Sequence, residues 1–141
     1  MLKTTVWIIC RTMHGDEAPL EKIRAFCLSL PDTSERLSHG APTFFIDGKR
    51  SFVQYHNNHH GDGRIGLCCA APDGFQPTLV EASPEIFYVP AYVGHLGWIG
   101  LRLDRNAEWH EIARTLSDAY LTRASKKQKQ KVADNNSFQL P

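Results

Sequence analysis

FYVPAYVGHLGWIGLRLD, residues 87–104, is the stretch that says most about the fold of this chain. Its two ends are rich in aromatic and β-branched residues, so we expect strands over Glu85–Val89 and Trp98–Leu103. The glycines in and after the intervening loop predict a tight turn and then a place where the backbone passes close to another element. The stretch contains no recognised catalytic signature, so it indicates a fold rather than a reaction.

Helical spacing of apolar residues predicts two long helices on either side of this stretch. The first covers Pro19–Leu30, with proline at the position where its missing N–H is not needed and Pro31 as a stop. The second carries an apolar stripe over Trp109–Tyr120, with Asn106 as its expected N-terminal cap. A short helix is expected from the Pro-Asp-Gly turn at residue 72 to about Ala82.

Three further strands are expected between the first long helix and the short one. Thr43–Ile46 and Ser51–His56 flank Asp47-Gly48-Lys49-Arg50, which is typical of a hairpin turn because Asp-Gly tolerates positive φ. The apolar run Ile65–Ala71 predicts a strand that is buried on both faces. The order α-β-β-β-α-β-β-α therefore predicts an α+β fold with a five-stranded antiparallel sheet and helices packed on one face.

Composition limits the class of protein. The chain has 141 residues, of which 42% are hydrophobic and 22% charged, and this is typical of one globular domain. Its apolar runs fall far short of the roughly 18 residues that span a bilayer, and Val6–Cys10 is shorter than a secretory hydrophobic region of about 7 to 15. We expect a cytoplasmic protein, with a monomer favoured. Residues 1–15 are expected to form an extension, poorly packed or an extra strand, before a domain over 16–124.

Neither the net charge nor the number and spacing of the cysteines points to a particular function. The net charge of +1 argues neither for nor against nucleic acid. Cations are concentrated in residues 125–141, which we expect to be a flexible basic tail. Cys10, Cys27, Cys68 and Cys69 lack the C-x-x-C spacing of zinc and redox sites. We expect free thiols, with the adjacent pair on opposite faces of a strand and one of them in the core.

His56, His59 and His60 lie with Asp62 in one loop, which raises the question of a metal site. Zinc needs three or four convergent ligands held by rigid elements, whereas this loop contains glycines. A solvated polar loop is the favoured interpretation, and we expect no resident metal or cofactor. The glycines at 94–100 lack the lysine of a phosphate-binding loop, and no nucleophile motif occurs elsewhere, so no enzyme is predicted.

Two groups of side chains are candidate contact residues. The first is a set of aromatic and histidine side chains that would line a ligand cleft, although alternate aromatics on strands are more often core residues. Its members are Tyr88, Tyr92, His95 and Trp98. The second is a set of cations that would form a basic surface if they converge. Its members are Lys49, Arg50, Arg64, Arg102, Lys126 and Lys127.

Several short motifs in order resemble the MmcQ/YjbR family of small bacterial proteins, over about Leu20–Lys127. They are Leu30-Pro31-Asp32, His39-Gly40-Ala41-Pro42-Thr43-Phe44, Gly48-Lys49 followed by Phe52, Pro84 to Pro90, Gly97-Trp98, Leu103-Asp104 and the Trp109–Tyr120 helix. The resemblance implies a compact domain related to frataxin-like folds, with a double-wing motif of paired hairpins. The matching wing is the Phe44–Phe52 hairpin, with Lys49 at its tip.

The function that this resemblance implies is weak, largely electrostatic and non-enzymatic DNA binding through the six cations. A small-ligand or protein-interaction module that uses the aromatic cleft is the alternative. A metal-handling protein is a third, suggested by the histidine loop and the frataxin-like architecture. The sequence leaves the choice among them open, and with it any ligand, any DNA sequence preference and the oligomeric state.

Overall fold

The computed structural model describes residues 17–58, 61 and 63–135. The elements in chain order are α2 (Glu17–Leu28), β1 (Thr33–Ser38), β2 (Ala41–Ile46), β3 (Arg50–Asn57), β4 (Ile65–Cys69), α3 (Phe75–Ala82), β5 (Phe87–Tyr88), the 3-10 helix η2 (Gly94–Leu96), β6 (Ile99–Arg102), α4 (Trp109–Arg123) and α5 (Lys126–Asp134). The expected extension over residues 1–15 lies outside the described residues, as do His59, His60 and Asp62. None of the described helices has the length and apolarity needed to cross a membrane.

The six strands form one antiparallel sheet in the order β1-β2-β3-β4-β6-β5. The expected α+β class is confirmed, but the expected count of five strands is wrong. The missed strand is β1, which pairs with β2 from Thr33↔Ile46 to Ser38↔Ala41. Its sequence, TSERLS, is polar because the strand lies at the sheet edge and is largely exposed, so it lacks the apolar alternation that marks a strand.

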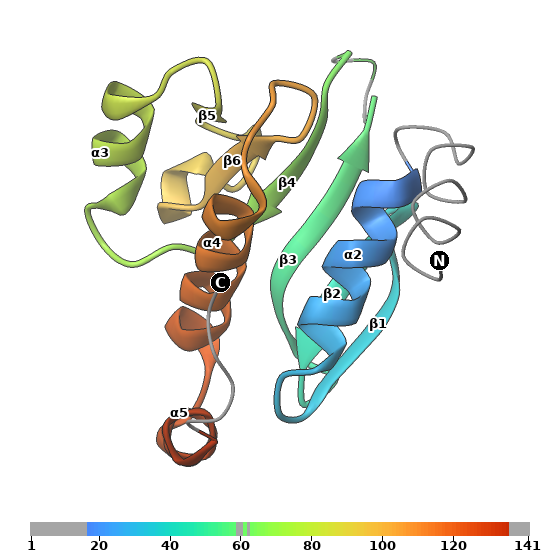
Figure 1. The fold of residues 1–141 in the computed structure, drawn as a ribbon, viewed down its shortest axis with the longest axis vertical. Helices are drawn as coiled ribbons and strands as arrows, with labels where there is room; N and C mark the ends of the chain where they lie inside the picture. The colour runs from blue at the N-terminus through green and yellow to red at the C-terminus, as the bar shows by residue number, and fades with distance from the viewer. Residues whose placement is uncertain (1–16, 59–60, 62, 136–141) are drawn as a thin grey trace, which may run out of the picture.

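The core lies between one face of the sheet and helices α2 and α4, which cover that face (Figure 1). Ile23 of α2 and Leu116 and Tyr120 of α4 are fully buried against Phe44 and Phe52 of the sheet. Each such side chain contributes about 1.5–3 kcal/mol to folding when it is fully buried. Helix α3 contacts β5 at the far edge of the sheet (Figure 1). The side of the sheet that faces away from α2 and α4 is called here the outer face.

The expected flexible tail is instead a helix over much of its length. Helix α5 begins with a capping box, in which the Ser125 backbone N–H donates to Gln128 Oε1 at 2.9 Å and the Gln128 N–H donates to Ser125 Oγ at 3.2 Å. This pair satisfies two of the N–H groups that a helix start leaves unpaired. The expected cap of α4 also differs, since its N-cap is Glu108, and Asn106 adopts φ +62° in the preceding loop.

Candidate ligand pocket and basic end

The register of the sheet sets one row of residues across five strands on the outer face. Thr43 pairs with Gln54, Gln54 with Cys68, Cys68 with Gly100, and Gly100 with Tyr88. Residues paired in register point to the same side of a sheet, and their chain neighbours point to the other. The prediction that Cys68 and Cys69 face opposite ways, with one in the core, is confirmed, because Cys69 belongs to the core cluster.

A pocket of about 580 Å³ lies over this row on the outer face. Its lining residues are His39, Gln54, His56, Arg64, Cys68, Tyr88, Pro90, Ala91, Tyr92 and Val93. Residues of strands β3, β4 and β5 form the floor, the loop after β5 forms one wall, and the β1–β2 turn supplies His39. The volume lies within the range of about 300–1,000 Å³ that is usual for small-molecule sites.

Tyr88 lies against the sheet because the strand residue beneath its ring, Gly100, is a glycine. A Cβ atom built on Gly100 would overlap Tyr88 Cε2 and Cζ and lie 2.7 Å from Cδ2. At Gly66 a Cβ atom would meet the Leu101 carbonyl oxygen at 2.7 Å, and the Tyr88 hydroxyl lies 3.3 Å away. The close approach predicted for the glycine-rich stretch is therefore present, and its partner is this ring. On the ring, the Arg64 guanidinium carbon lies 4.1 Å from the centroid, which is cation–π distance. The Tyr88 ring therefore lies between the sheet and the Arg64 guanidinium.

The loop wall is held by α3. Gln76 Nε2 donates to the carbonyl oxygens of Gly94 at 2.8 Å and Trp98 at 2.6 Å, so it ties both ends of η2 to the helix. Gly97 then closes η2 with φ +87°, which accounts for the predicted tight turn. Tyr92, in the same wall, has φ +68°, a conformation that costs a non-glycine residue about 1–3 kcal/mol and is concentrated at functional sites.

Hydrogen bonds fix the orientation of two polar side chains in the floor. Gln54 Nε2 donates to the Ser38 carbonyl at 3.0 Å and to Thr43 Oγ1 at 2.8 Å. Because a carbonyl only accepts, this end of the amide must be the NH₂ group, and Oε1 must face His56 Nε2 at 2.7 Å. That oxygen also only accepts. His56 therefore carries a proton on Nε2.

The cysteine in the floor is not poised for nucleophilic chemistry. Burial raises the pKa of the Cys68 thiol to about 12. The thiolate is the reactive form, so Cys68 is neutral and inert at physiological pH. None of the lining residues described here is an aspartate or glutamate. In the described ranges, no group of three or more His, Cys, Asp or Glu residues is arranged to hold a metal ion.

The structure brings together two of the four predicted cleft residues. Tyr88 and Tyr92 line the pocket. His95 is exposed on η2, and Trp98 is half-buried against the core. Sequence reasoning missed Gln54 and His39 as pocket residues. The signal available for Gln54 was the polar alternation with His56 along β3.

The cations of the hairpin tip and of α5 meet at one end of the molecule, called here the basic end. Arg50 Nη2 donates to Asp47 Oδ2 at 3.0 Å and to Gln128 Oε1 at 3.2 Å. Gln128 Nε2 donates in turn to Asp32 at 3.1 Å and to Asp47 at 3.2 Å. Gln128 is 4% exposed, so it joins α5 to the hairpin as a buried polar contact.

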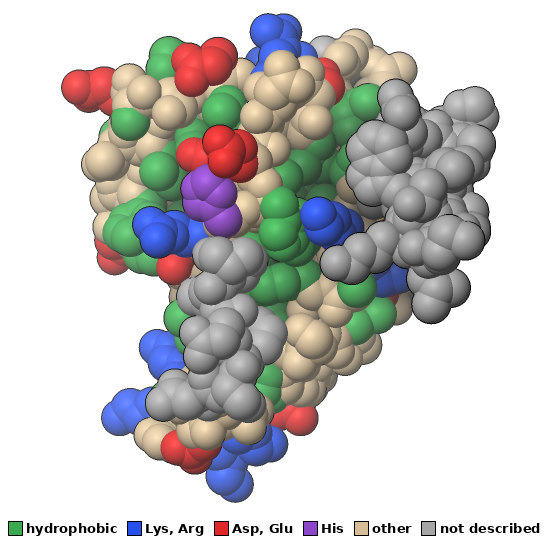
Figure 2. All heavy atoms as spheres, in the orientation of Figure 1, with side chains coloured by type: hydrophobic (Ala, Val, Ile, Leu, Met, Phe, Trp, Pro, Cys, Tyr) green, Lys and Arg blue, Asp and Glu red, His purple; other side chains and the backbone are tan. Residues whose placement is uncertain are grey.

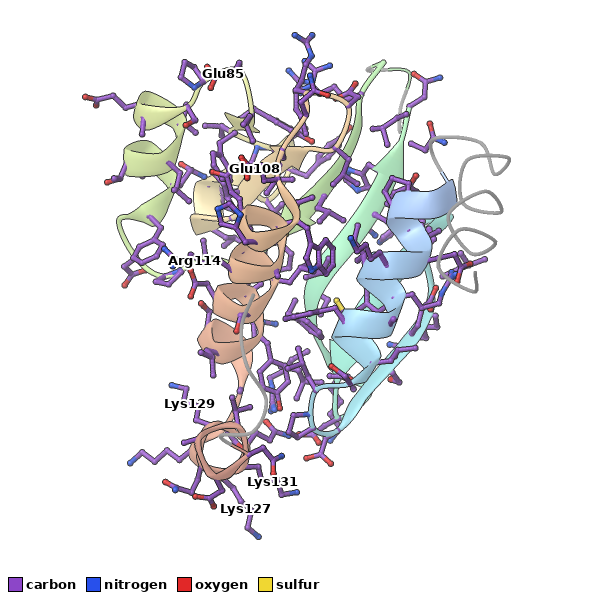
Figure 3. All side chains as sticks on the ribbon, viewed as in Figure 1. Glu85, Glu108, Arg114, Lys127, Lys129 and Lys131 are labelled. Carbon is purple, nitrogen blue, oxygen red and sulfur yellow. The ribbon has the colours of Figure 1, made fainter. Side chains whose placement is uncertain are left out.

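Lysine side chains project from α5, and one of them, Lys131, reaches back to this contact. Lys and Arg side chains gather around α5 in Figure 2, and Lys127, Lys129 and Lys131 extend from the helix in Figure 3. Lys131 Nζ lies 3.8 Å from Asp32 Oδ2. Lys126 and Lys127 are exposed, as is Lys49 at the hairpin tip. Four of the six predicted cations, with Arg50 included, therefore belong to the basic end.

Arg64 and Arg102 lie elsewhere. Strand β3 runs from Arg50 to Asn57, about 23 Å at ~3.3 Å per residue, and β4 begins beside its far end through the pair Asn57↔Ile65. Arg64 precedes β4 there and lines the pocket. Arg102 donates to Asp104 Oδ1 at 3.0 Å and to Oδ2 at 3.1 Å. The six cations do not form one surface.

Together these features define a small α+β protein with an antiparallel sheet, two long helices on one face and a pocket on the other. The YjbR family model matches residues 28–122, and the chain belongs to the YjbR family, as the sequence motifs predicted. Its fold is similar to the crystal structure of Deinococcus radiodurans protein DR2400, which contains the family-model domain DUF419. The TM-score is 0.65 at 16% sequence identity, over 81% of this chain and 87% of that chain. A search of curated proteins finds no match.

Proposed function

We propose that this protein is a binding module that takes a small organic ligand in the pocket of the outer face. The observation that carries the proposal is the pocket itself, which combines a mostly apolar lining with a few polar groups from β3, the β1–β2 turn and the residue before β4. The floor is built on paired strands, and rigid elements hold a binding site more precisely than loops do. The left-handed backbone at Tyr92 in one wall and at His39 in the β1–β2 turn adds local strain of the kind that binding sites retain.

A binding role is proposed rather than catalysis because the side chains in the floor are engaged with each other. Gln54 and His56 share a hydrogen bond that orients both groups. The thiol of Cys68 is neutral at physiological pH because burial raises its pKa to about 12. These groups are suited to recognising a ligand by shape and hydrogen bonding.

An NMR screen of small fragments against the ¹⁵N-labelled full chain tests this proposal. We expect fragment-induced shifts at pocket residues, and we expect the Ala91→Trp variant to lose them because its indole fills the pocket from an exposed wall position. Ala82→Trp, at an exposed position on α3 outside the lining, is the matched control and should leave binding unchanged. Fragments that bind the Ala91→Trp and Ala82→Trp variants equally well would contradict the proposal.

DNA binding at the basic end is the second candidate function. The observation that favours it is the Gln128 contact, which fixes α5 beside the hairpin tip and so presents its lysines together with Lys49. Lysines held on an ordered helix neutralise phosphates without first ordering a flexible chain. Asp32 and Asp47 lie at the same end and oppose the binding of a polyanion. The DNA binding that we propose here is therefore of low affinity, sensitive to salt and independent of sequence.

Fluorescence anisotropy with a short duplex at low and moderate salt tests the second candidate. Lys127→Glu combined with Lys129→Glu should weaken binding on the order of tenfold and reduce the salt slope by about two, one per lost phosphate contact. Lys22→Glu combined with Arg114→Glu is the matched control, since it changes the net charge equally and Arg114 projects from α4 away from α5 (Figure 3). Equal losses in both double variants, or no binding at low salt, would argue against a DNA site here.

A further inference from the structure

The charges around the pocket select among classes of ligand. The described lining contains one arginine and two histidines and no carboxylate side chain. Arg64 places a positively charged guanidinium in this lining. A ligand ammonium group would meet no carboxylate from these lining residues, whereas a ligand anion would meet a guanidinium.

The stacking of Arg64 determines how an anion would be bound. One face of the Tyr88 ring lies on the sheet at Gly100, so the guanidinium 4.1 Å from the ring centroid must lie on its other face. A stacked guanidinium offers its N–H groups at its edge, and this fork matches the spacing of carboxylate and phosphate oxygens. The stack also limits the freedom of a long side chain that an anion would otherwise have to order.

The loop after β5 forms a part of the pocket that is suited to an apolar group. Pro90, Ala91, Tyr92 and Val93 line it, and Gln76 holds the loop in place through the Gly94 and Trp98 carbonyls. Tyr92 is 77% exposed, so its ring stands at the rim, where it can contact a bound molecule. One pocket thus combines a guanidinium that can bind an anion with a loop that can contact an apolar group.

We propose that the ligand of the pocket is a small organic anion, a carboxylate or phosphate joined to an apolar or aromatic body, with the anion at the Arg64 guanidinium and the body against Pro90, Tyr92 and Val93. This inference rests on the proposed function, since it names the ligand class of the same site.

Four probes that share a naphthalene body but differ in charge test the inference: 2-naphthoate, 2-naphthyl phosphate, the neutral 2-naphthamide and the cationic 2-naphthylmethylamine. Each is titrated into the ¹⁵N-labelled full chain. We expect at least one anion to bind on the order of tenfold more tightly than the amide and the amine. The better of the two anions identifies the head group.

Substitution of the arginine gives an independent measurement. Arg64→Gln should weaken the anion on the order of tenfold and leave the amide unchanged, while Arg64→Lys should recover part of the loss because it keeps the charge but not the fork. Arg114→Gln, remote on α4, is the control, and the spectrum of each variant without probe reports whether it is folded.

The possible failures are distinguishable. The anion inference is overturned if the amide or the amine shifts pocket residues as strongly as the anions do. It is also overturned if Arg64→Gln leaves anion binding unchanged in a folded variant. In both cases the pocket is still a binding site for small ligands. If none of the four probes shifts any pocket residue, the proposed function is overturned along with the anion inference.

Discussion

The pocket and the basic end are built in opposite ways. The pocket gathers residues from the β1–β2 turn, three strands and the loop after β5, and only the register of the sheet brings them together. The basic end joins three short segments, Asp32 before β1, the turn at Asp47–Arg50 and the start of α5, through one buried glutamine. The pocket therefore depends on the whole fold, whereas the basic end depends on a local contact that can fail without loss of the core.

The largest expected effect is at Gly100, beneath the Tyr88 ring. Gly100→Ala places a Cβ atom against that ring in a buried strand, so the ring must move. Overpacking of this kind costs about 1–3 kcal/mol, and we expect a loss of stability near the upper end of that range. Displacing Tyr88 also removes the support of Arg64 and should abolish ligand binding. Urea unfolding and probe titration measure the two losses.

A double-mutant cycle separates the steric cause from a general intolerance of alanine in β6. In a Tyr88→Ala background the three atoms nearest to the new Cβ are gone. Gly100→Ala should then be neutral or stabilising by up to about 1 kcal/mol, because alanine loses less backbone entropy than glycine in a strand. If Gly100→Ala costs the same in both backgrounds, Tyr88 is not what the glycine accommodates.

A smaller effect is expected at Gln128, at the basic end. Gln128→Ala removes hydrogen bonds to Asp32, Asp47 and Arg50 and should cost about 1–2 kcal/mol. Hydrogen exchange should show faster exchange along α5 with little change in the sheet. Gln130→Ala, on the exposed side of the same helix, should cost only a few tenths of a kcal/mol. Similar exchange in the two variants would show that the buried contact does not hold the helix.

The smallest effect is a pH dependence at the edge of the outer face. The hydrogen bond from Arg102 lowers the pKa of Asp104 below its ordinary value of 3.8. The folded pKa is thus below the unfolded one, so this pair stabilises the fold fully above about pH 4–5 and loses its contribution as the pH falls through the folded pKa. Both side chains are partly exposed, and the contribution should be less than about 1 kcal/mol.

Asp104→Asn tests this through urea unfolding at pH 7 and at pH 3. The variant should be less stable than the natural chain at pH 7, and this difference in the free energy of unfolding should be smaller at pH 3. Asp73→Asn, at an exposed position, is the control and should show no such narrowing. If Asp104→Asn lowers the free energy of unfolding by the same amount at both pH values, the ion pair is not the cause of the loss.

The sequence predicts the elements that have strong local patterns and misses what depends on pairing. The Asp-Gly turn, the buried strand β4 and the stripe of α4 are each marked by neighbouring residues, and all three are confirmed. Strand β1 has no such pattern, because it is polar and lies at the sheet edge. The capping box of α5 is present in the sequence at Ser125–Gln128, but the run of lysines around it is also typical of a solvated tail.

The pocket could not be predicted in full for a physical reason. Side chains alternate between the two faces of a strand, so a slip of one residue in any pairing would move Gln54 or Cys68 to the other side. The irregular register between Phe44 and Phe45, which no local pattern marks, changes the alternation at the point where β2 meets β3. Residue type alone predicts Tyr88 and Tyr92 as pocket residues. For Arg64 it predicts a basic surface, whereas the fold places this side chain on the Tyr88 ring.

The most direct test of the central claim, that the outer-face pocket and not the basic end takes a small ligand, is a titration of the ¹⁵N-labelled full chain with 2-naphthoate. The amides of Gln54, Tyr88 and Val93 report the pocket, and those of Lys127 and Lys129 report the basic end. The predicted result is saturable shifts in the first group that Gly100→Ala abolishes. Shifts confined to the two lysines, or pocket shifts that persist in Gly100→Ala, would contradict it.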